Sequence, residues 1–162
     1  MGTRPNNAHG SPLAKKLGIK GGHRVAFPAA PDGFERLLGK LPEGVQVRSR
    51  AAGPLDVVVY FTTRRAELER RLPTLRRALD PAGGLWIAWP KGSSGVETDM
   101  TEDVTRELGY ANKLVDNKVC AIDETWSGLR LVIRLSDRQA APSRSVGRSP
   151  QRLKRSGRRG RA

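Results

Sequence analysis

One connection between two apolar runs holds side chains that could carry out chemistry. Within CAIDETWSGLRLVIRL, the residues Asp123, Glu124, Thr125, Trp126 and Ser127 follow one another. As a site, Asp123 would act as a general base or bind a ligand amine, and Trp126 would be a stacking wall. As structure, Asp123 or Thr125 would accept backbone hydrogen bonds in a hairpin turn, and Trp126 would cover a gap beside the preceding helix. We favour the structural interpretation, because a lone carboxylate performs no recognisable reaction.

A second candidate site lies where three connections that follow predicted strands should meet: PAAPD, TTRR and PKGSSG. In an open parallel sheet, ligands bind beyond the carboxyl ends of the strands, where the strand order reverses. Two cations and several hydroxyls would meet there and could hold an anion or a phosphate. Alternatively, the threonines cap the following helix and KGSSG is an ordinary flexible loop. The candidate ligand-binding residues of these loops are Thr62, Thr63, Arg64, Lys91, Ser93 and Ser94.

The sequence offers no catalytic constellation and no metal site. It contains one cysteine, Cys120, and two histidines, His9 and His23, so no Cys/His spacing can build a zinc site. We place His9 in a loose leader and His23 at the start of a strand, at the end opposite the expected ligand crevice. Neither histidine can complete a Ser-His-Asp or Cys-His arrangement. We therefore predict no catalytic residue, no metal and no cofactor.

The positive charge is concentrated near the carboxyl end of the chain. The formal net charge is +14, but residues 138–162 contain nine Lys and Arg and no acid. We interpret this segment as a disordered basic tail, because it has few apolar residues with which to build a core. With an arginine-rich helix, the tail could hold nucleic acid through salt-sensitive contacts that are not sequence-specific. The residues of this alternative are Arg70, Arg71, Arg76, Arg77, Arg152, Lys154, Arg155, Arg158 and Arg159.

Hydrophobic periodicity predicts alternating strands and helices that would position these candidates. Strands are expected in HRVAFPAAP, VQVRSR, LDVVVYFTT, GGLWIAWPK, NKVCAID and LRLVIRL. Helices are expected in PLAKKLGIKGG, DGFERLLGKLPEG, RAELERRLPTLRRALDPAGG and TDMTEDVTRELGY. Trp86 and Trp89 should point to opposite faces of their strand and pack under helices, and Cys120 should be a small core residue.

Several details of these elements can be tested directly. Pro73 should kink or restart its helix, and Gly109 should end the next one. The last two strands form an antiparallel hairpin joined by five residues, 124–128, with the final glycine supplying unusual dihedrals. Arg130 and Arg134 should share the exposed face of the second hairpin strand, and the hairpin should form a sheet edge.

The order of elements resembles a Rossmann-like methyltransferase domain that is shortened by about one strand-helix unit. At the level of residues, the chain resembles a family of small bacterial cytoplasmic proteins of unknown function. The matching stretches are PLAKKLGIKGGHRVAF, GPLDVVVYF, GGLWIAWPKGSSGV and VDNKVCAIDETWSGLRLVIRL, including the AIDETWSGL motif. This resemblance implies a fold and a compartment, but no catalytic residues.

The chain departs from working methyltransferases of this fold at two positions. An S-adenosylmethionine site of this fold needs a glycine-rich turn after the first strand and usually an acid at the end of the second. Here the turn contains Pro28 and Pro31, and the second strand ends in Arg48, Ser49 and Arg50. Both departures argue against binding of this cofactor.

We therefore predict a Rossmann-like α/β three-layer sandwich with a mostly parallel sheet of about six strands. Residues 1–11 would be a flexible leader, 12–137 the domain and 138–162 the tail. We expect a cytoplasmic, non-membrane protein that binds a small anionic ligand or a protein partner without catalysis. Nucleic-acid association and divergent S-adenosylmethionine-dependent methyl transfer are the alternatives. The sequence does not indicate the oligomeric state.

Overall fold

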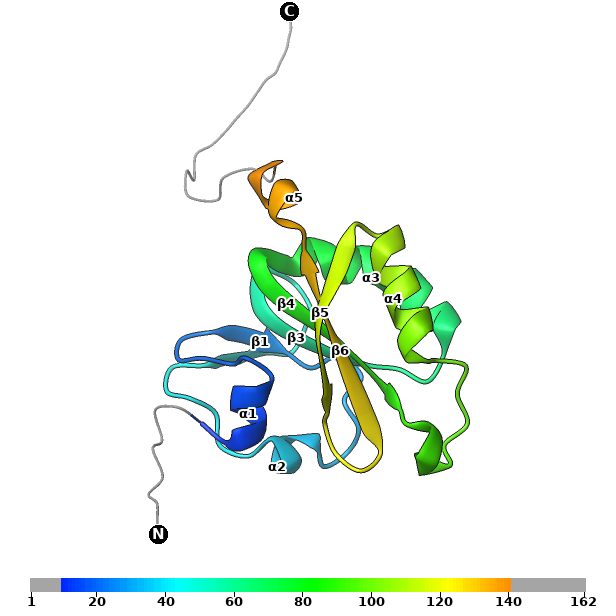
Figure 1. Cartoon of the computed structure of the whole chain (residues 1–162). Helices are drawn as coiled ribbons and strands as arrows, with labels where there is room; N and C mark the ends of the chain where they lie inside the picture. The colour runs from blue at the N-terminus through cyan, green and yellow to red at the C-terminus, as the bar shows by residue number, and fades with distance from the viewer. Residues whose placement is uncertain (1–9, 141–162) are drawn as a thin grey trace, which may run out of the picture.

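The computed structural model describes residues 10–140 and arranges them as one sheet between two layers of helices (Figure 1). The strands are β1 (Arg24–Ala26), β2 (Gln46–Arg48), β3 (Leu55–Phe61), β4 (Leu79–Pro90), β5 (Leu114–Ala121) and β6 (Trp126–Ile133). The α-helices are α1 (Pro12–Lys16), α2 (Phe34–Leu38), α3 (Arg65–Ala78), α4 (Glu102–Ala111) and α5 (Leu135–Ala140), and η2 (Gly92–Ser94) is a 3-10 turn.

The sheet has the strand order β2-β1-β3-β4-β6-β5. Strands β1 to β4 pair in parallel, whereas β6 runs antiparallel to both β4 and β5. The order reverses between β1 and β3, because the chain adds β2 on one side of β1 and all later strands on the other. This topology confirms the predicted Rossmann-like fold that ends in an antiparallel hairpin.

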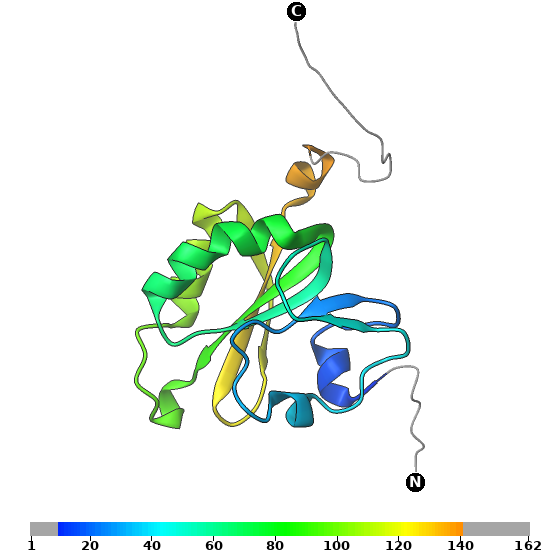
Figure 2. The ribbon, with the colours of Figure 1, turned by 180° about the vertical axis from the view of Figure 1, so that it is seen from behind.

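Two apolar clusters cover the two faces of the sheet. Helices α3 and α4 lie on one face, and α1 and α2 lie on the other (Figure 2). Trp86 belongs to the cluster under α1 and α2, and Trp89 to the cluster under α3 and α4, as the alternation of strand side chains predicted. Cys120 is half-buried beside the first of these clusters, and burial raises the pKa of its thiol.

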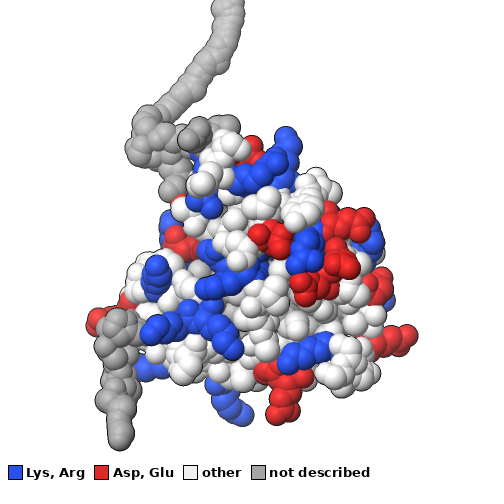
Figure 3. Space-filling model, viewed as in Figure 1, with Lys and Arg blue, Asp and Glu red and all other residues white. Residues whose placement is uncertain are grey.

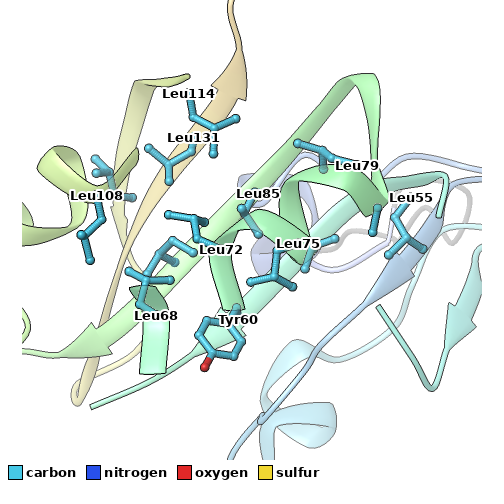
Figure 4. Packing of buried hydrophobic residues seen from close by; sticks show 14 of the residues in the cluster. Leu55, Tyr60, Leu68, Leu72, Leu75, Leu79, Leu85, Leu108, Leu114 and Leu131 are labelled. Carbon is cyan, nitrogen blue, oxygen red and sulfur yellow. The ribbon is translucent and has the colours of Figure 1, made fainter. Parts of the chain in front are cut away.

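Helix α3 is held by a single stripe of leucines. Leu68, Leu72 and Leu75 are fully buried and pack against side chains of the sheet such as Tyr60 (Figure 4). Pro73 does not restart the helix, which continues from Arg65 to Ala78. The proline lies on the exposed side, and the buried leucines on either side of it keep both halves docked on the sheet.

Helix α4 begins after a capping threonine and continues past Gly109, the glycine expected to end it. The Thr101 hydroxyl accepts a hydrogen bond from the Val104 amide and caps the first turn. Gly109 does not end the helix, which continues to Ala111. A Cβ atom at Gly109 would lie 2.8 Å from a methyl carbon of Leu131, so this glycine allows α4 to approach the sheet closely.

The connection of the hairpin is shorter than predicted. Strand β6 already begins at Trp126, so Gly128 lies inside the strand and not in the turn. Its Cβ would lie 3.1 Å from the Trp86 ring, which shows that the glycine makes room for packing. β5 is the outer strand at this edge, and β6 lies between β4 and β5.

Helices α1 and α2 are each only five residues long, so they cover just part of their face of the sheet. Helix α2 ends at Gly39, whose φ of 75° is left-handed, and Leu41 of the predicted helix lies beyond it. The chain also forms α5, which includes residues 138–140 of the predicted tail; residues 141–162 lie outside the described part. Within residues 10–140, no helix has the length and apolar character needed to cross a bilayer.

Candidate anion-binding site

The crevice at the carboxyl ends of β1 and β3, where such folds bind ligands, is filled by aromatic rings. Phe27 contacts Phe34 with ring centroids 5.2 Å apart, Phe34 contacts Phe61 at 4.9 Å, and Phe61 contacts Trp126 at 5.1 Å. All three contacts are edge-to-face, a favourable geometry for aromatic pairs. The chain therefore closes this crevice with its own side chains.

Asp123 has the structural role that we favoured from the sequence. Its Oδ1 atom accepts hydrogen bonds from the amides of Thr125 at 2.8 Å and Trp126 at 2.7 Å, which fixes the turn. Asp123 and Trp126 also line a cavity of about 140 Å³ beside Phe61. The predicted loop residues 62–64 and 91–94 do not line that cavity.

The first predicted loop uses its polar groups to start helix α3. The Thr62 hydroxyl accepts a hydrogen bond from the Arg64 amide at 3.1 Å and lies 3.2 Å from the Glu67 carboxylate. The Thr63 carbonyl accepts a hydrogen bond from the Thr98 hydroxyl at 2.7 Å. The N-cap residue of α3 is Arg64 and its side chain accepts no cap hydrogen bond, so the threonines fix the turn before the helix and do not cap it.

The second predicted loop is also internally bonded. The Ser94 hydroxyl donates to the Lys91 carbonyl at 2.7 Å, and Ser93 is exposed. The Asp99 carboxylate accepts a hydrogen bond from the Arg65 amide at 2.7 Å, at the amino end of α3. Anion binding at these loops stays a prediction, and the carboxylates of Asp99 and Glu67 work against it.

The arginines of α3 do not form a uniform basic face. Arg71 lies 5.3 Å from the centre of the Tyr60 ring in a cation–π contact. Arg76 is half-buried, and Arg70 and Arg77 are exposed. The tail residues of the nucleic-acid alternative lie outside the described residues: Arg152, Lys154, Arg155, Arg158 and Arg159.

A different basic site lies on the opposite face of the sheet, toward the amino ends of β3 and β4. It is an open cavity of about 450 Å³ between the end of α1, these strand ends and the middle of β5 and β6. Lysine and arginine side chains gather over this part of the molecule (Figure 3). We call it the Arg130 groove and define it by its charged side chains, Lys15, Lys16, Lys20, Asp56, Asp80, Lys118 and Arg130.

Arg130 is built into the floor of this groove. Its guanidinium lies over Gly84, where a Cβ atom would be 2.3 Å from Nε and 2.6 Å from Cζ. Its register partners are Trp86 on β4 and Lys118 on β5, so all three side chains share one face. The prediction that Arg130 would be exposed is wrong, because β5 is the outer strand and leaves Arg130 half-buried between β4 and β5.

The groove contains both carboxylates and cations, and Nη1 of Arg130 lies 3.4 Å from the Asn117 Oδ1 atom. Burial lowers the pKa of Arg130, and the positive charge of Arg138 lowers it further. Asp56 is paired with Arg24 through Nε–Oδ2 at 3.1 Å and Nη2–Oδ1 at 3.2 Å. Burial acts to raise the pKa of Asp56, but the hydrogen bonds from Arg24 bring it below its ordinary value. One of the two groove carboxylates is therefore already neutralised within the chain.

Sequence reasoning missed the groove because its cations come from three separate elements. The signals available were the AKKLGIK cluster and the single arginine between leucines in LRL. The expected five-residue connection would have paired Arg130 with Ile122, whereas the observed hairpin pairs it with Lys118. Among residues 10–140, no three His, Cys, Asp or Glu side chains lie close enough to hold a metal ion.

The fold is that of S-adenosylmethionine-dependent methyltransferases. A methyltransferase of this class from Aquifex aeolicus has a TM-score of 0.60 at 16% identity, covering 75% of this chain and 88% of that one. A putative type 11 methyltransferase from Sulfolobus solfataricus has a TM-score of 0.56 at 14% identity, covering 78% and 92%. No family model and no curated protein matches, so the resemblance to a family of unknown function gains no support. At these identities the likeness establishes the fold alone.

The residues at the switch point do not fit the cofactor of that fold. The turn after β1 contains two prolines, and the rings of Phe34 and Phe61 fill the crevice. The cavity there, about 140 Å³, is smaller than the roughly 300 Å³ lower bound of typical ligand pockets. A second hollow of about 400 Å³ is lined by residues 30–36, and it shares Pro31, Asp32, Gly33 and Phe34 with the smaller cavity. Strand β2, which ends in Arg48, is the exposed edge of the sheet, so no further strand flanks it.

Proposed function

We propose that this methyltransferase-like domain binds a phosphate-bearing anion in the Arg130 groove and does not transfer a methyl group. The observation that carries the proposal is the position of Arg130, whose guanidinium is half-buried over Gly84 beside Lys118. A buried arginine is costly unless its charge is compensated, and a bidentate oxyanion suits the planar guanidinium. Lys15, on α1, would complete the contacts from the opposite wall.

The location of the groove also separates this function from methyl transfer. It lies toward the amino ends of β3 and β4, whereas the cofactor crevice of such sheets lies beyond the carboxyl ends. Binding there requires no cofactor and no acid–base group. The fold then serves as a rigid scaffold that brings cations of α1, β5 and β6 together.

Methyl transfer from S-adenosylmethionine is the second candidate function. It is favoured by the shared fold, since the neighbours from Aquifex aeolicus and Sulfolobus solfataricus are described as methyltransferases. For this candidate to hold, the aromatic rings at the carboxyl ends of β1 and β3 would have to move apart when the cofactor binds. A titration can separate the two candidates.

Isothermal titration calorimetry of the full chain with inorganic pyrophosphate tests the proposal. Arg130→Gln should weaken binding at least tenfold, because one charge-assisted hydrogen bond contributes about 1.5–3 kcal/mol. Arg64→Gln is the matched control: it removes one arginine charge at the loops predicted from the sequence and should leave the affinity unchanged. S-adenosylmethionine should give no heat.

Two outcomes would overturn the proposal. One is the absence of pyrophosphate binding by the wild-type chain, and the other is a loss of binding in Arg64→Gln but not in Arg130→Gln. Saturable heat with S-adenosylmethionine, abolished by Phe61→Trp in the crevice, would favour methyl transfer instead.

A further inference from the structure

The Arg130 groove is wider and more open than a site for one small anion requires. Its cations come from α1 and the turn after it, from β5 and from β6, so a ligand that meets all of them must extend across the face of the sheet. Figure 3 shows several patches of Lys and Arg over this part of the surface, separated by uncharged residues. A ligand with several phosphates can contact more of these cations than a single phosphate can.

Two of the cations come from directly opposed positions of the hairpin. Lys118 and Arg130 are register partners on neighbouring antiparallel strands, so their Cβ atoms are about 5 Å apart. The Arg130 guanidinium lies over Gly84 of β4, and its Nη1 atom is 3.4 Å from the Asn117 Oδ1 atom. An oxyanion in the groove could contact both cations.

The basic sequence at the end of the chain begins beside the same site. Arg138 donates from Nε to the Ile133 carbonyl at 2.8 Å, at the end of β6, and its charge acts on Arg130. From Arg138 onward, residues 138–162 contain nine Lys and Arg and no acid. Of the groove cations, Arg130 is therefore close along the chain to the start of this segment.

The groove has few groups that could stack on bases. Trp86 is fully buried, with its indole N–H donated to the Leu17 carbonyl at 2.9 Å, and the half-buried His23 accepts a hydrogen bond from the Lys20 amide through Nδ1 at 3.1 Å. Base stacking needs an accessible ring face. Recognition here must rely on phosphate charge, which does not depend on sequence.

We infer that the Arg130 groove binds the phosphodiester backbone of a nucleic acid without sequence specificity. This inference rests on the proposed function, because it identifies the source of the phosphates that the groove holds. An extended polyanion presents several phosphates, which can contact Lys15, Lys118 and Arg130 and also Lys20 in the turn after α1.

Fluorescence anisotropy of the full chain with a labelled 20-base-pair DNA duplex of random sequence tests the inference. Each phosphate contact contributes a slope of about 0.9 to the dependence of log affinity on log salt concentration. The double variant Lys118→Gln/Arg130→Gln should therefore reduce the slope by about 1.8. By the same relation, it should weaken binding at 0.1 M salt on the order of 60-fold.

Two further variants make the test specific to the groove. Arg70→Gln/Arg77→Gln removes the same charge from α3, on the opposite face of the sheet, and should change the slope by less than half as much. Gly84→Ala leaves the net charge unchanged but introduces a Cβ where the Arg130 guanidinium lies. Gly84→Ala should therefore also weaken binding of the duplex. Thermal unfolding of each variant shows whether its fold is intact.

The outcomes separate this inference from the proposed function. If pyrophosphate binds and the duplex does not, the inference fails and the proposed function stands; if neither binds, both fail. Equal losses in the two double variants would overturn the inference, as would equal affinity for an acidic polyglutamate of the same charge, which would indicate a protein ligand.

Discussion

Removal of the Asp56 carboxylate should lower the stability of the fold. It should also raise the affinity of the Arg130 groove for an anion. Asp56 accepts three hydrogen bonds from Arg24: from the amide at 2.8 Å, from Nε at 3.1 Å and from Nη2 at 3.2 Å. The two side chains are 31% and 20% exposed, so solvent reduces each contribution. We expect Asp56→Ala to lower the free energy of unfolding by about 2 kcal/mol at pH 7. The midpoint of thermal unfolding should fall by roughly 6–10 °C.

The pH dependence of this loss follows from the direction of the pKa shift. The folded-state pKa of Asp56 lies below its ordinary value of 3.8, because Arg24 stabilises the carboxylate more than burial destabilises it. The stabilisation is therefore complete above the ordinary pKa and is lost as the pH falls through the folded-state value. The difference between wild type and Asp56→Ala should be constant from pH 5 to 8 and should close below about pH 3.8.

Urea unfolding followed by tryptophan fluorescence at a series of pH values measures this difference. Asp56→Asn is the informative companion, since it keeps a hydrogen-bond acceptor but removes the charge. It should lose less stability than Asp56→Ala and bind pyrophosphate more tightly than the wild type, because one anion leaves the groove. A stability difference that stays unchanged down to pH 2.5 would refute the assignment to the carboxylate charge.

Three further predictions concern positions whose role the structure defines. Asp123→Ala should destabilise the fold by about 1–2 kcal/mol because two turn amides lose their acceptor, whereas Asp123→Asn should keep most of the stability, as chemical denaturation can show. Thr101→Ala should cost about 1 kcal/mol through loss of the α4 cap, and Thr101→Ser should cost much less; equal costs would exclude the cap. Gly109→Leu should cost about 1–3 kcal/mol by overpacking against Leu131, although leucine favours helices; a stabilised variant, measured by thermal unfolding, would contradict this.

The alternation of apolar segments was enough to predict the fold. LDVVVYF is apolar at nearly every position, and such a run is typical of a parallel strand that is covered on both faces. The leucine stripe Leu68, Leu72, Leu75 and Leu79 predicted the helix that covers one of those faces, although Leu79 is the first residue of β4. The short link between two late strands predicted the antiparallel hairpin. The opposed positions of Trp86 and Trp89 also followed from strand geometry. These features depend on local periodicity, which a sequence displays directly.

Turn boundaries and close packing could not be predicted in the same way. Gly109 and Gly128 suggested a helix end and a turn, because glycine tolerates unusual dihedrals. In the structure both glycines lie inside regular elements, where a side chain would collide with Leu131 or with Trp86. A glycine can permit unusual dihedrals at a turn, or it can permit close packing inside a helix or strand. Only its neighbours in the tertiary structure show which role it has.

The sequence by itself determined the fold class, the charge distribution and the two prolines of the turn after β1. Only the tertiary structure decided where cations meet. Lys15, Lys118 and Arg130 are far apart in the chain, and they come together because a four-residue turn sets the hairpin register and α1 packs against the same face. Electrostatic interactions depend on distance through space, and that distance is fixed by packing and strand register.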